Sequence, residues 1–361
     1  MNEIDHARTD EGGMAPEGER APERVRTVVT AALASRGVRD AKEVADLLVE
    51  TSLLGIHTHG VRMLSAYIDE LDRGVARPDP SPRIFKDTGP VVQVDADGAL
   101  GASAALNGTR IAVERARAHG VGVVGVRGSN HFGAAGAYAR RIAAEGLLGF
   151  VTTSAASRVA PFGGIEALFG TNPVAIAFGP DFCLDMATSQ VCFGEIKERR
   201  RTGQDLEPGW ALDPTGDTAI RPDDAGALSP LGGYKGHGLA MAVSVLTAVL
   251  VGGPLDFQMA HIGTSDDGAD RGVAHLFIAL DPSAFGGREA ARERMSTLVD
   301  RVRTAESRDP ASPVLAPGDP QREHEARQSA GGLELDGATL DLLRVLEAEM
   351  TAGGQGREVT R

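Results

Sequence analysis

The period of the apolar pattern changes near residue 80, and this change limits the folds that the chain can adopt. Before it, apolar residues recur at helical spacing in three segments, which end at Gly37, Gly55 and Gly74. A proline-rich linker follows at residues 78–82. Beyond the linker, short strand-like segments alternate with helical ones. The pattern therefore predicts a helical unit followed by an α/β layer.

The same pattern assigns individual elements. We expect strands at 91–94, 121–127, 147–153, 174–178, 182–184 and 274–280, with the last returning to the same sheet. We expect helices at 104–119, 134–145, 235–251, 288–303 and 338–350. No element is assigned to 305–328, which is polar and contains proline, and residues 1–20 are expected to be disordered.

Charge and apolar length exclude several classes of protein. Acidic residues outnumber basic ones by 50 to 37, and a chain with a net charge of −13 repels the phosphates of nucleic acids. The longest apolar segment, 238–252, is too short to span a bilayer, and the N-terminus lacks the apolar core of a signal peptide. Cys183 and Cys192 form neither a zinc motif nor a disulfide framework. We therefore expect a cytoplasmic protein that binds neither nucleic acid nor membranes.

Two segments carry side chains suited to proton transfer and carboxylate binding. One expected strand leads directly into Asn130 and His131, and ligands of α/β sheets bind at the carboxyl ends of strands. The turn before the third helix contains His57, His59 and Arg62. A histidine exchanges protons near neutral pH, and an arginine can bind a carboxylate with two hydrogen bonds. The three histidines also leave open a metal-dependent hydrolase or lyase, although no carboxylate follows at metal-ligand spacing.

Three further segments are candidates for a cofactor groove. Gly170, Thr171 and Asn172 form a tight turn before a proline. Asp185 lies at the end of a strand, where it could accept hydrogen bonds from a ribose or cap a helix. Lys235 follows a glycine-rich loop at the start of a helix, where a phosphate can bind, but the spacing is not that of a Walker motif. The letters GxGxxG at 120–125 lie inside an expected strand, which is the wrong context for a dinucleotide turn.

Taken together, the ordered motifs resemble the malate/L-lactate dehydrogenase type 2 family over about residues 23–285. In chain order they are G-I-H-T-H-G at 55–60, S-N-H-F-G at 129–133, P-F-G-G at 161–164, G-T-N-P at 170–173, L-D-M-A-T-S at 184–189 and P-L-G-G-Y-K-G at 230–236. Each motif alone is weak evidence, whereas the ordered set is highly specific.

The resemblance implies an α/β fold with a non-Rossmann NAD(P)-binding sheet domain of the L-sulfolactate dehydrogenase-like type. It also implies a helical domain formed by both chain ends, a homodimer, and NAD or NADP as cofactor. It divides the chain into a tail (1–20), an N-terminal helical part (21–80), the NAD(P)-binding domain (81–285, including a helical segment at 190–250) and a C-terminal helical part (286–361) that packs against the N-terminal one.

The resemblance also implies roles for particular residues. His59 is the leading proton donor or acceptor, and His131 is a second candidate with Asn130 beside it. The residues that match cofactor-contacting stretches of the family are Asp185, Met186, Ala187 and Lys235. The implied reaction is a hydride transfer between the nicotinamide and a small 2-hydroxy or 2-oxo acid, or an amino or imino acid, without a metal.

The chain departs from the family pattern at several positions. Met63 stands where the family often has arginine, so the assignment of Arg62 to the substrate carboxylate rests on the chemistry of arginine and not on the resemblance. His57 stands where aspartate is common, and Glu195 stands where lysine is common. These departures leave open the substrate, the choice between NAD and NADP, and a non-catalytic ligand-binding protein of the same fold. The sequence predicts an NAD(P)-dependent oxidoreductase.

Overall fold

Three helices form the N-terminal part of the computed structural model, which describes residues 17–264 and 268–355. These helices are α1 (Pro22–Ala34), α2 (Ala41–Leu53) and α3 (Leu64–Asp72). They confirm the three helical segments expected before residue 75. Most of the tail that is expected to be disordered, 1–16, lies outside the described residues, while Glu17–Arg20 forms a 3-10 turn.

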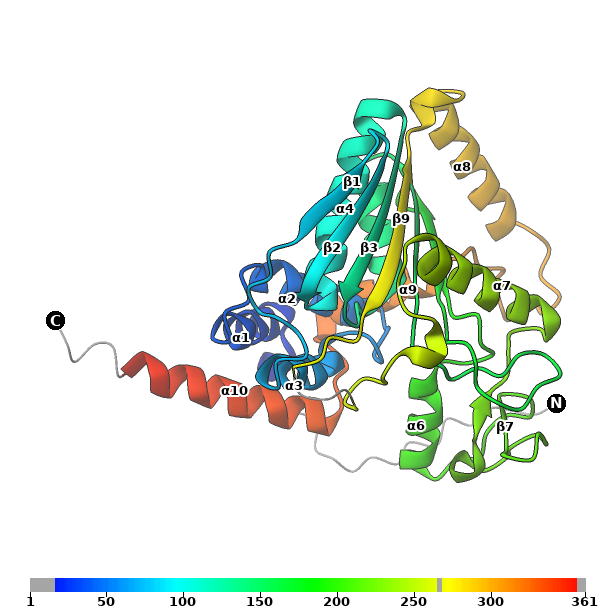
Figure 1. Cartoon of the computed structure of the whole chain (residues 1–361). Coiled ribbons are helices and arrows are strands. Elements are labelled where there is room, and N and C mark those ends of the chain that lie inside the picture. Colours follow the sequence, from blue (N-terminus) through cyan, green and yellow to red (C-terminus); the bar gives the residue numbers. More distant parts are fainter. Residues whose placement is uncertain (1–16, 265–267, 356–361) are drawn as a thin grey trace.

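A seven-stranded mixed sheet forms the centre of the molecule (Figure 1), in the order β1-β2-β3-β9-β4-β5-β6. Its strands are β1 (Arg83–Asp87), β2 (Val91–Ala99), β3 (Val121–Ser129), β4 (Leu148–Thr153), β5 (Val174–Phe178), β6 (Phe182–Met186) and β9 (Val273–Leu280). β2 and β3 are parallel, and every other neighbouring pair is antiparallel. β2, β3, β4 and β6 therefore run in one direction, and β1, β5 and β9 run in the other. The last expected strand does return to the sheet, between β3 and β4.

Two helices cover one face of the sheet. α4 (Gly101–His119) packs on β2, β3 and β9, and α5 (Ala135–Ala144) packs on β4, β5 and β6. Gly122 of β3 lets α4 approach closely, because a Cβ there would lie 2.1 Å from the carbonyl oxygen of Ala112. The main hydrophobic core fills this layer, and its largest side chains include Phe132, Tyr138, Ile142 and Phe277.

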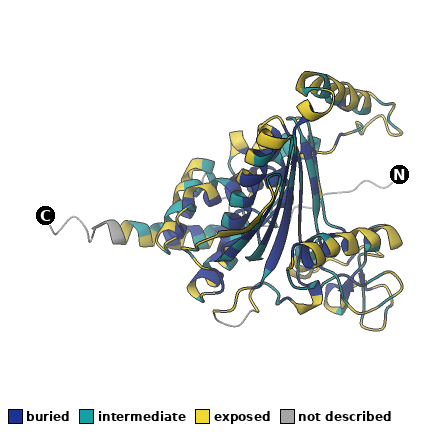
Figure 2. Cartoon of the chain, turned by 45° about the horizontal axis from the view of Figure 1, so that its top comes forward, coloured by how far each residue is buried: buried dark blue, intermediate teal, exposed yellow. Residues whose placement is uncertain are grey.

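The opposite face of the sheet is only partly covered. Helix α7 (Tyr234–Ser244) continues into a π-helical turn (Val245–Leu250), which contacts β9. Val251 packs against Leu276, and a Cβ at Gly125 of β3 would lie 2.7 Å from Val251. The outer surface of α7 is exposed, while the strands are largely buried (Figure 2). Among the described helices, none is long and apolar enough to cross a membrane.

The helical segment expected at 190–250 is interrupted. Its first part contains one helix and two short paired strands, namely α6 (Phe193–Thr202), β7 (Ala211–Leu212) and β8 (Ala227–Leu228). From 203 to 233 the chain contains many Asp, Pro and Gly residues, which favour turns over helix. This part packs around a small core of its own that includes Ile196, Leu206 and Leu228. The segment is therefore helical in α6 and from α7 onward, with turns and a short pair of strands between them.

The C-terminal part contains three helices, α8 (Arg288–Arg303), α9 (Asp319–Gly331) and α10 (Gly337–Gln355). α8 and α10 confirm expected helices, whereas α9 lies largely in the segment 305–328, to which the sequence assigned no element. Its sequence carries almost no apolar stripe, and its one buried residue is the polar Gln328. α9 packs against α2, and α10 packs against α1.

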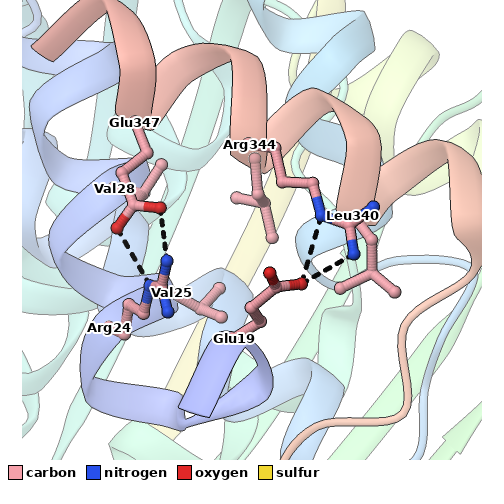
Figure 3. A pocket seen from close by; sticks show the side chains of 8 residues that line it. Glu19, Arg24, Val25, Val28, Leu340, Arg344 and Glu347 are labelled. Atoms are coloured by element: carbon pink, nitrogen blue, oxygen red, sulfur yellow. Dashed lines mark hydrogen bonds and ion pairs between the residues drawn. The ribbon is translucent and has the colours of Figure 1, made fainter. Parts of the chain in front are cut away.

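Ion pairs join the two ends of the chain. Arg24 of α1 lies 2.6 Å from Glu347 of α10, and Glu19 lies 2.8 Å from Arg344 of α10. Figure 3 shows both pairs. Val25 lies between these pairs and is buried. The first and last described helices therefore belong to one helical layer. The division of the chain into domains at residues 80 and 285 stays a prediction.

Candidate active site

One edge of the sheet collects most of the candidate residues. β2, β3, β4 and β6 end at this edge, and β5 and β9 begin there because they run in the opposite direction. The segments at the edge are 130–133 after β3, 154–158 after β4, 170–173 before β5, 185–189 at the end of β6, and 271–272 before β9. The carboxyl ends of strands are where α/β sheets bind ligands. In Figure 1, β2 and β3 end beside α3, which carries a further part of the site.

His131 is held by α3 and by its own loop. The hydroxyl of Tyr67 lies 3.1 Å from Nδ1 of His131, and the N–H of Gly133 donates to the same nitrogen at 3.4 Å. Because an N–H only donates, Nδ1 is an acceptor, and the neutral ring carries its proton on Nε2. Burial lowers the pKa of His131 well below its ordinary value, and the nearby charges of His59 and Arg271 lower it further. His131 is therefore neutral at pH 7, with Nε2 available to a ligand.

His59 stacks on His131, with the ring centroids 5.7 Å apart. Nδ1 of His59 lies 2.7 Å from the hydroxyl of Thr58, which leaves Nε2 available to a ligand. Burial lowers the pKa of His59 to about 4, so this ring is also neutral at pH 7. The structure thus brings together two neutral imidazoles, each with one nitrogen committed to the protein.

A buried ion pair lies behind His131. Glu70 and Arg271 are almost fully buried, and Nη1 of the arginine lies 3.6 Å from Oε1 of the glutamate. Burial raises the pKa of Glu70 to about 7, although the charge of Arg271 opposes this shift. The pair links α3 to the start of β9, next to the loop that carries His131.

Asn130 is fully buried beside this ion pair, and within the described residues all hydrogen bonds of its side chain are to backbone groups. Its amide nitrogen donates to the carbonyls of Val75, Gly98 and Ala99 at 3.0 to 3.4 Å. Its oxygen accepts from the N–H of Arg271 at 3.3 Å. These contacts fix the loop that carries His131, so we regard Asn130 as a positioning residue.

Arg62 lies in the same turn as His59, but its guanidinium contacts acidic side chains. Its Nε lies 3.3 Å from Asp336, and its Nη1 lies 3.7 Å from Glu198. A substrate carboxylate at Arg62 would compete with both of these carboxylates. The assignment of Arg62 to the substrate stays a prediction, which these contacts do not favour.

His57 has surroundings of its own. Its Nε2 lies 3.4 Å from Glu334, and its ring centroid lies 6.4 Å from that of His324. The described part of the chain contains no group of three His, Cys, Asp or Glu side chains that could hold a metal ion. Of the three histidines in the metal-dependent alternative, His59 and His131 therefore lie together, and His57 lies in separate surroundings.

The three segments expected to contact the cofactor are hydrogen-bonded to one another. The N–H of Thr188 donates to the carbonyl of Thr171 at 2.8 Å, and the N–H of Leu231 donates to the carbonyl of Thr188 at 2.9 Å. The end of β6 therefore lies between the turn at 170–173 and the loop that opens α7. The chain order of the motifs does not show this adjacency, because it arises from the antiparallel pairing of β5 with β6.

Gly170 and Asn172 attach their turn to the neighbouring elements. One carboxylate oxygen of Asp256 accepts from the N–H of Gly170 at 2.9 Å, from the amide of Asn172 at 2.7 Å and from the hydroxyl of Ser244 at 2.8 Å. Burial raises the pKa of Asp256. Asn172 is fully buried, so its side chain organises this turn.

Asp185 connects β6 to the helix that follows the His131 loop. Its carboxylate accepts from the N–H of Gly136 at 2.9 Å, in the first turn of α5, where a negative charge is favourable. Met186 and Ala187 follow it and are half-buried. Lys235 is exposed in the first turn of α7, and within the described residues it forms no ion pair.

Sequence reasoning assigned no functional role to Thr58, Tyr67 or Arg158. Tyr67 fits the apolar stripe of its helix, so its hydroxyl was not distinguished from the core. Arg158 follows β4 at the same edge as His131. The sequence does distinguish Arg158, because it is the only charged residue between Ser154 and Gly164, in a stretch of small and apolar residues.

Comparisons with known proteins agree with this arrangement. A family model described as malate/L-lactate dehydrogenase matches residues 21–344. The chain is 35% identical to malate dehydrogenase of Pyrococcus horikoshii over 298 residues, which cover 78% of this chain and 82% of that protein. It is 33% identical to L-sulfolactate dehydrogenase of Methanocaldococcus jannaschii over 322 residues, which cover 87% and 92%.

Solved structures show the same fold. The sulfolactate dehydrogenase from Methanocaldococcus jannaschii matches with a TM-score of 0.84 and 31% identity, covering 91% of this chain and 96% of that one. The expected fold class, an α/β sheet domain of the sulfolactate dehydrogenase-like type with helices from both chain ends, is confirmed.

Proposed function

The chain belongs to the malate/L-lactate dehydrogenase family, and on that premise we propose how its residues carry the reaction. It is an NAD(P)-dependent oxidoreductase. We infer that it interconverts a small 2-hydroxy acid and its 2-oxo acid, or the corresponding amino and imino acids. The observation that carries this proposal is the stacked pair of neutral histidines, His59 and His131, at the carboxyl edge of the sheet.

The residues at this edge fit a nicotinamide dinucleotide. Lys235 stands unpaired, among the described residues, at the N-terminus of α7, where helix N–H groups and a positive charge favour a phosphate. Asp185, Met186 and Ala187 lie at the end of β6, one hydrogen-bonded segment away. We therefore place a cofactor phosphate at Lys235 and the rest of the dinucleotide along the end of β6. NAD or NADP, when bound, supplies or accepts the hydride.

His59 exchanges the proton in this proposal. When the hydroxy acid is oxidised, neutral Nε2 accepts the hydroxyl proton, and in the reverse direction it returns that proton. This role requires the tautomer in which Nδ1–H of His59 donates to the hydroxyl of Thr58, and the two atoms are 2.7 Å apart. Burial keeps the ring neutral and ready to accept a proton at pH 7.

His131 orients the substrate. Its Nδ1 accepts from Tyr67 and Gly133, so its Nε2–H can donate a hydrogen bond to the substrate oxygen or nitrogen. The residues behind it, Asn130 and Arg271, fix the loop and not the substrate. Proton exchange and substrate orientation are thereby divided between two stacked rings.

A screen for turnover tests the proposed function. The purified protein is incubated in EDTA with NADH or NADPH and a panel of 2-oxo acids and cyclic imino acids, and the loss of absorbance at the nicotinamide band is followed. We expect oxidation of one cofactor with at least one acid. Tight NADH or NADPH binding without turnover would favour a non-catalytic protein, and activity that EDTA abolishes and zinc restores would favour the metal-dependent alternative.

We also propose that the protein is a homodimer. Helix α7 and the π-helical turn after it carry large apolar side chains that are exposed in the single chain, namely Leu239, Met241, Val245, Val249 and Leu250. Val249 alone is 69% exposed. Exposed large apolar side chains gathered on one helical segment are typical of a protein–protein interface.

A further inference from the structure

Two positive side chains approach one aromatic ring at the start of α6. The guanidinium carbon of Arg158 lies 3.9 Å from the ring centroid of Phe193, and Nζ of Lys197 lies 5.4 Å from the same centroid. Arg158 lies in the loop after β4, and the other two residues come from the first turns of α6. We call these three residues the cationic cradle.

Neither cation of the cradle is neutralised. Within residues 17–264 and 268–355, no carboxylate lies within ion-pair distance of Arg158 or Lys197. Arginines close to Lys197 in the sequence do have such partners, since Arg199 contacts Glu195 at 3.3 Å and Arg200 contacts Asp223 at 2.7 Å. Arg158 is half-buried, and burial lowers its pKa. A half-buried charge without a counter-charge is unfavourable, and a second cation shares the ring of Phe193, so the cradle is complementary to an anion.

The cradle lies next to the proton-exchanging histidine. Gly194 follows Phe193 directly, and a Cβ at Gly194 would lie 2.8 Å from Cγ2 of Thr58. The hydroxyl of Thr58 in turn lies 2.7 Å from Nδ1 of His59. α6 therefore approaches the His59 turn at the residue that adjoins the cradle.

The charge of Arg158 acts on the same surroundings as the charge of Arg271. Burial lowers the pKa of His261, and the charges of Arg158 and Arg271 lower it further. Burial also lowers the pKa of His131, and the charge of Arg271 is among those that lower it further. Arg271 is itself occupied by Glu70, and its Nε donates to the carbonyl of Ala260. Of the two arginines, Arg158 is the one whose guanidinium is only half-buried and has no protein acceptor among the described residues.

We propose that Arg158, supported by Lys197, binds the carboxylate of the substrate. This inference rests on the proposed function and names the residue that recognises the acid. The planar guanidinium offers a carboxylate two parallel hydrogen bonds, while its stacking on Phe193 fixes its plane. The adjacent Thr58–His59 turn then lies beside the carbon that bears the hydroxyl or oxo group. Arg62, which has two carboxylate partners, is not needed for this binding.

The test compares a 2-oxo acid with its neutral methyl ester, using the acid that the wild-type protein reduces best. The measured quantity is the ratio of kcat/KM for the acid to kcat/KM for the ester, because general damage to the fold affects both substrates alike. In Arg158→Gln we expect this ratio to fall about 10- to 100-fold, since a charge-assisted bond is lost. In Lys197→Gln we expect a smaller fall, because a flexible ammonium contributes less to orientation.

Arg199→Gln is the matched control, because Arg199 also stacks on an aromatic ring, that of Trp210 at 4.9 Å, in the same part of the chain. We expect its ratio to match that of the wild type. An unchanged ratio in Arg158→Gln overturns the proposal, and a collapse of the ratio in Arg62→Gln alone assigns the carboxylate to Arg62. Weaker binding of NADPH, with unchanged binding of NADH, in Arg158→Gln would assign the cradle to a cofactor phosphate and would also overturn it.

Binding of oxalate, measured by calorimetry in the presence of NADH, separates this proposal from the proposed function. If the wild-type protein reduces none of the acids, the proposed function fails, and oxalate binding still tests the cradle. We expect the Kd of oxalate to rise at least about 10-fold in Arg158→Gln. Equal oxalate affinity in Arg158→Gln and the wild type contradicts the cradle, whatever the outcome of the turnover assay.

Discussion

Two hydroxyl groups, those of Thr58 and Tyr67, determine which nitrogen of each active-site histidine faces a ligand. Each hydroxyl lies within hydrogen-bond distance of an Nδ1, so both rings offer Nε2. Burial lowers the pKa of both rings, so both are neutral at pH 7. A neutral ring accepts a proton without first losing one, which suits His59 to oxidation of a hydroxy acid at neutral pH.

The pH dependence of this oxidation follows from the same burial. The base must be neutral, and His59 stays neutral down to a pKa of about 4, compared with 6.5 for an ordinary histidine. Since kcat/KM reports the free enzyme, we expect it to remain above half its neutral value well below pH 6. The measurement is kcat/KM for hydroxy acid oxidation from about pH 4.5 to 8, with circular dichroism at each pH as a control for unfolding. A half-point near 6.5 in a folded enzyme would contradict the assignment of a buried base.

At the level of elements, the sequence predicts those helices and strands that have a periodic apolar pattern. α1, α2, α4, α5 and most strands of the sheet have clear apolar stripes or runs, and these elements were found. β1 was missed because all five of its residues are exposed at the sheet edge, and α9 was missed because its face toward α2 is polar. The motifs led to His59 and His131, but their partners, Thr58, Tyr67 and Arg271, come together only through tertiary packing, which a single sequence does not show.

The contact between α3 and the start of β9 has a testable electrostatic consequence. Burial raises the pKa of Glu70 to about 7 from an ordinary 4.5. Between these two values the unfolded chain has released the proton while the folded chain retains it. This group therefore contributes less stability as pH rises from 4.5 to 7. The amide of Glu70→Gln does not titrate, so the free energy of unfolding of this variant should increase relative to the wild type over the same pH range.

The check is urea denaturation of both proteins at about pH 4.5, 6 and 7.5. The amide of the variant differs from the carboxyl group beside Arg271 at every pH, so the quantity to compare is the change with pH of the stability difference between the two proteins, and not the sign of that difference. A stability difference that stays constant as pH rises would show that the pKa of Glu70 is not raised in the folded protein. A gain in stability of the wild type relative to Glu70→Gln as pH rises would show the same.

At the level of the whole molecule, the helices of the two chain ends form one layer, and the exposed apolar face of α7 lies on a different part of the surface (Figure 1). The ion pairs of Arg24 and Arg344 join the chain ends within one chain. The face of α7 has no such covering, since Val249 is 69% and Leu250 is 62% exposed. A second copy of the chain would remove these side chains from water.

Light scattering at micromolar concentration should therefore give the mass of a dimer. Val249→Glu should dissociate it, because a charge would be buried at the interface. Val345→Glu is the matched control, since Val345 is also exposed, at 56%, but lies on α10. A monomeric wild-type protein would contradict the homodimer, and dissociation by Val345→Glu alone would move the interface to α10.

The division of labour between the stacked histidines is the central claim, and one measurement tests it most directly: kcat and the Kd of NADH or NADPH for His59→Ala and His131→Ala. Loss of the proton-exchanging group should lower kcat of His59→Ala by about 10²- to 10⁴-fold while cofactor affinity stays nearly unchanged. His131→Ala should lower kcat less and weaken ligand binding more, because its ring orients the substrate. Near-normal kcat in His59→Ala, together with a collapse of kcat in His131→Ala, would contradict the account and assign the proton to His131.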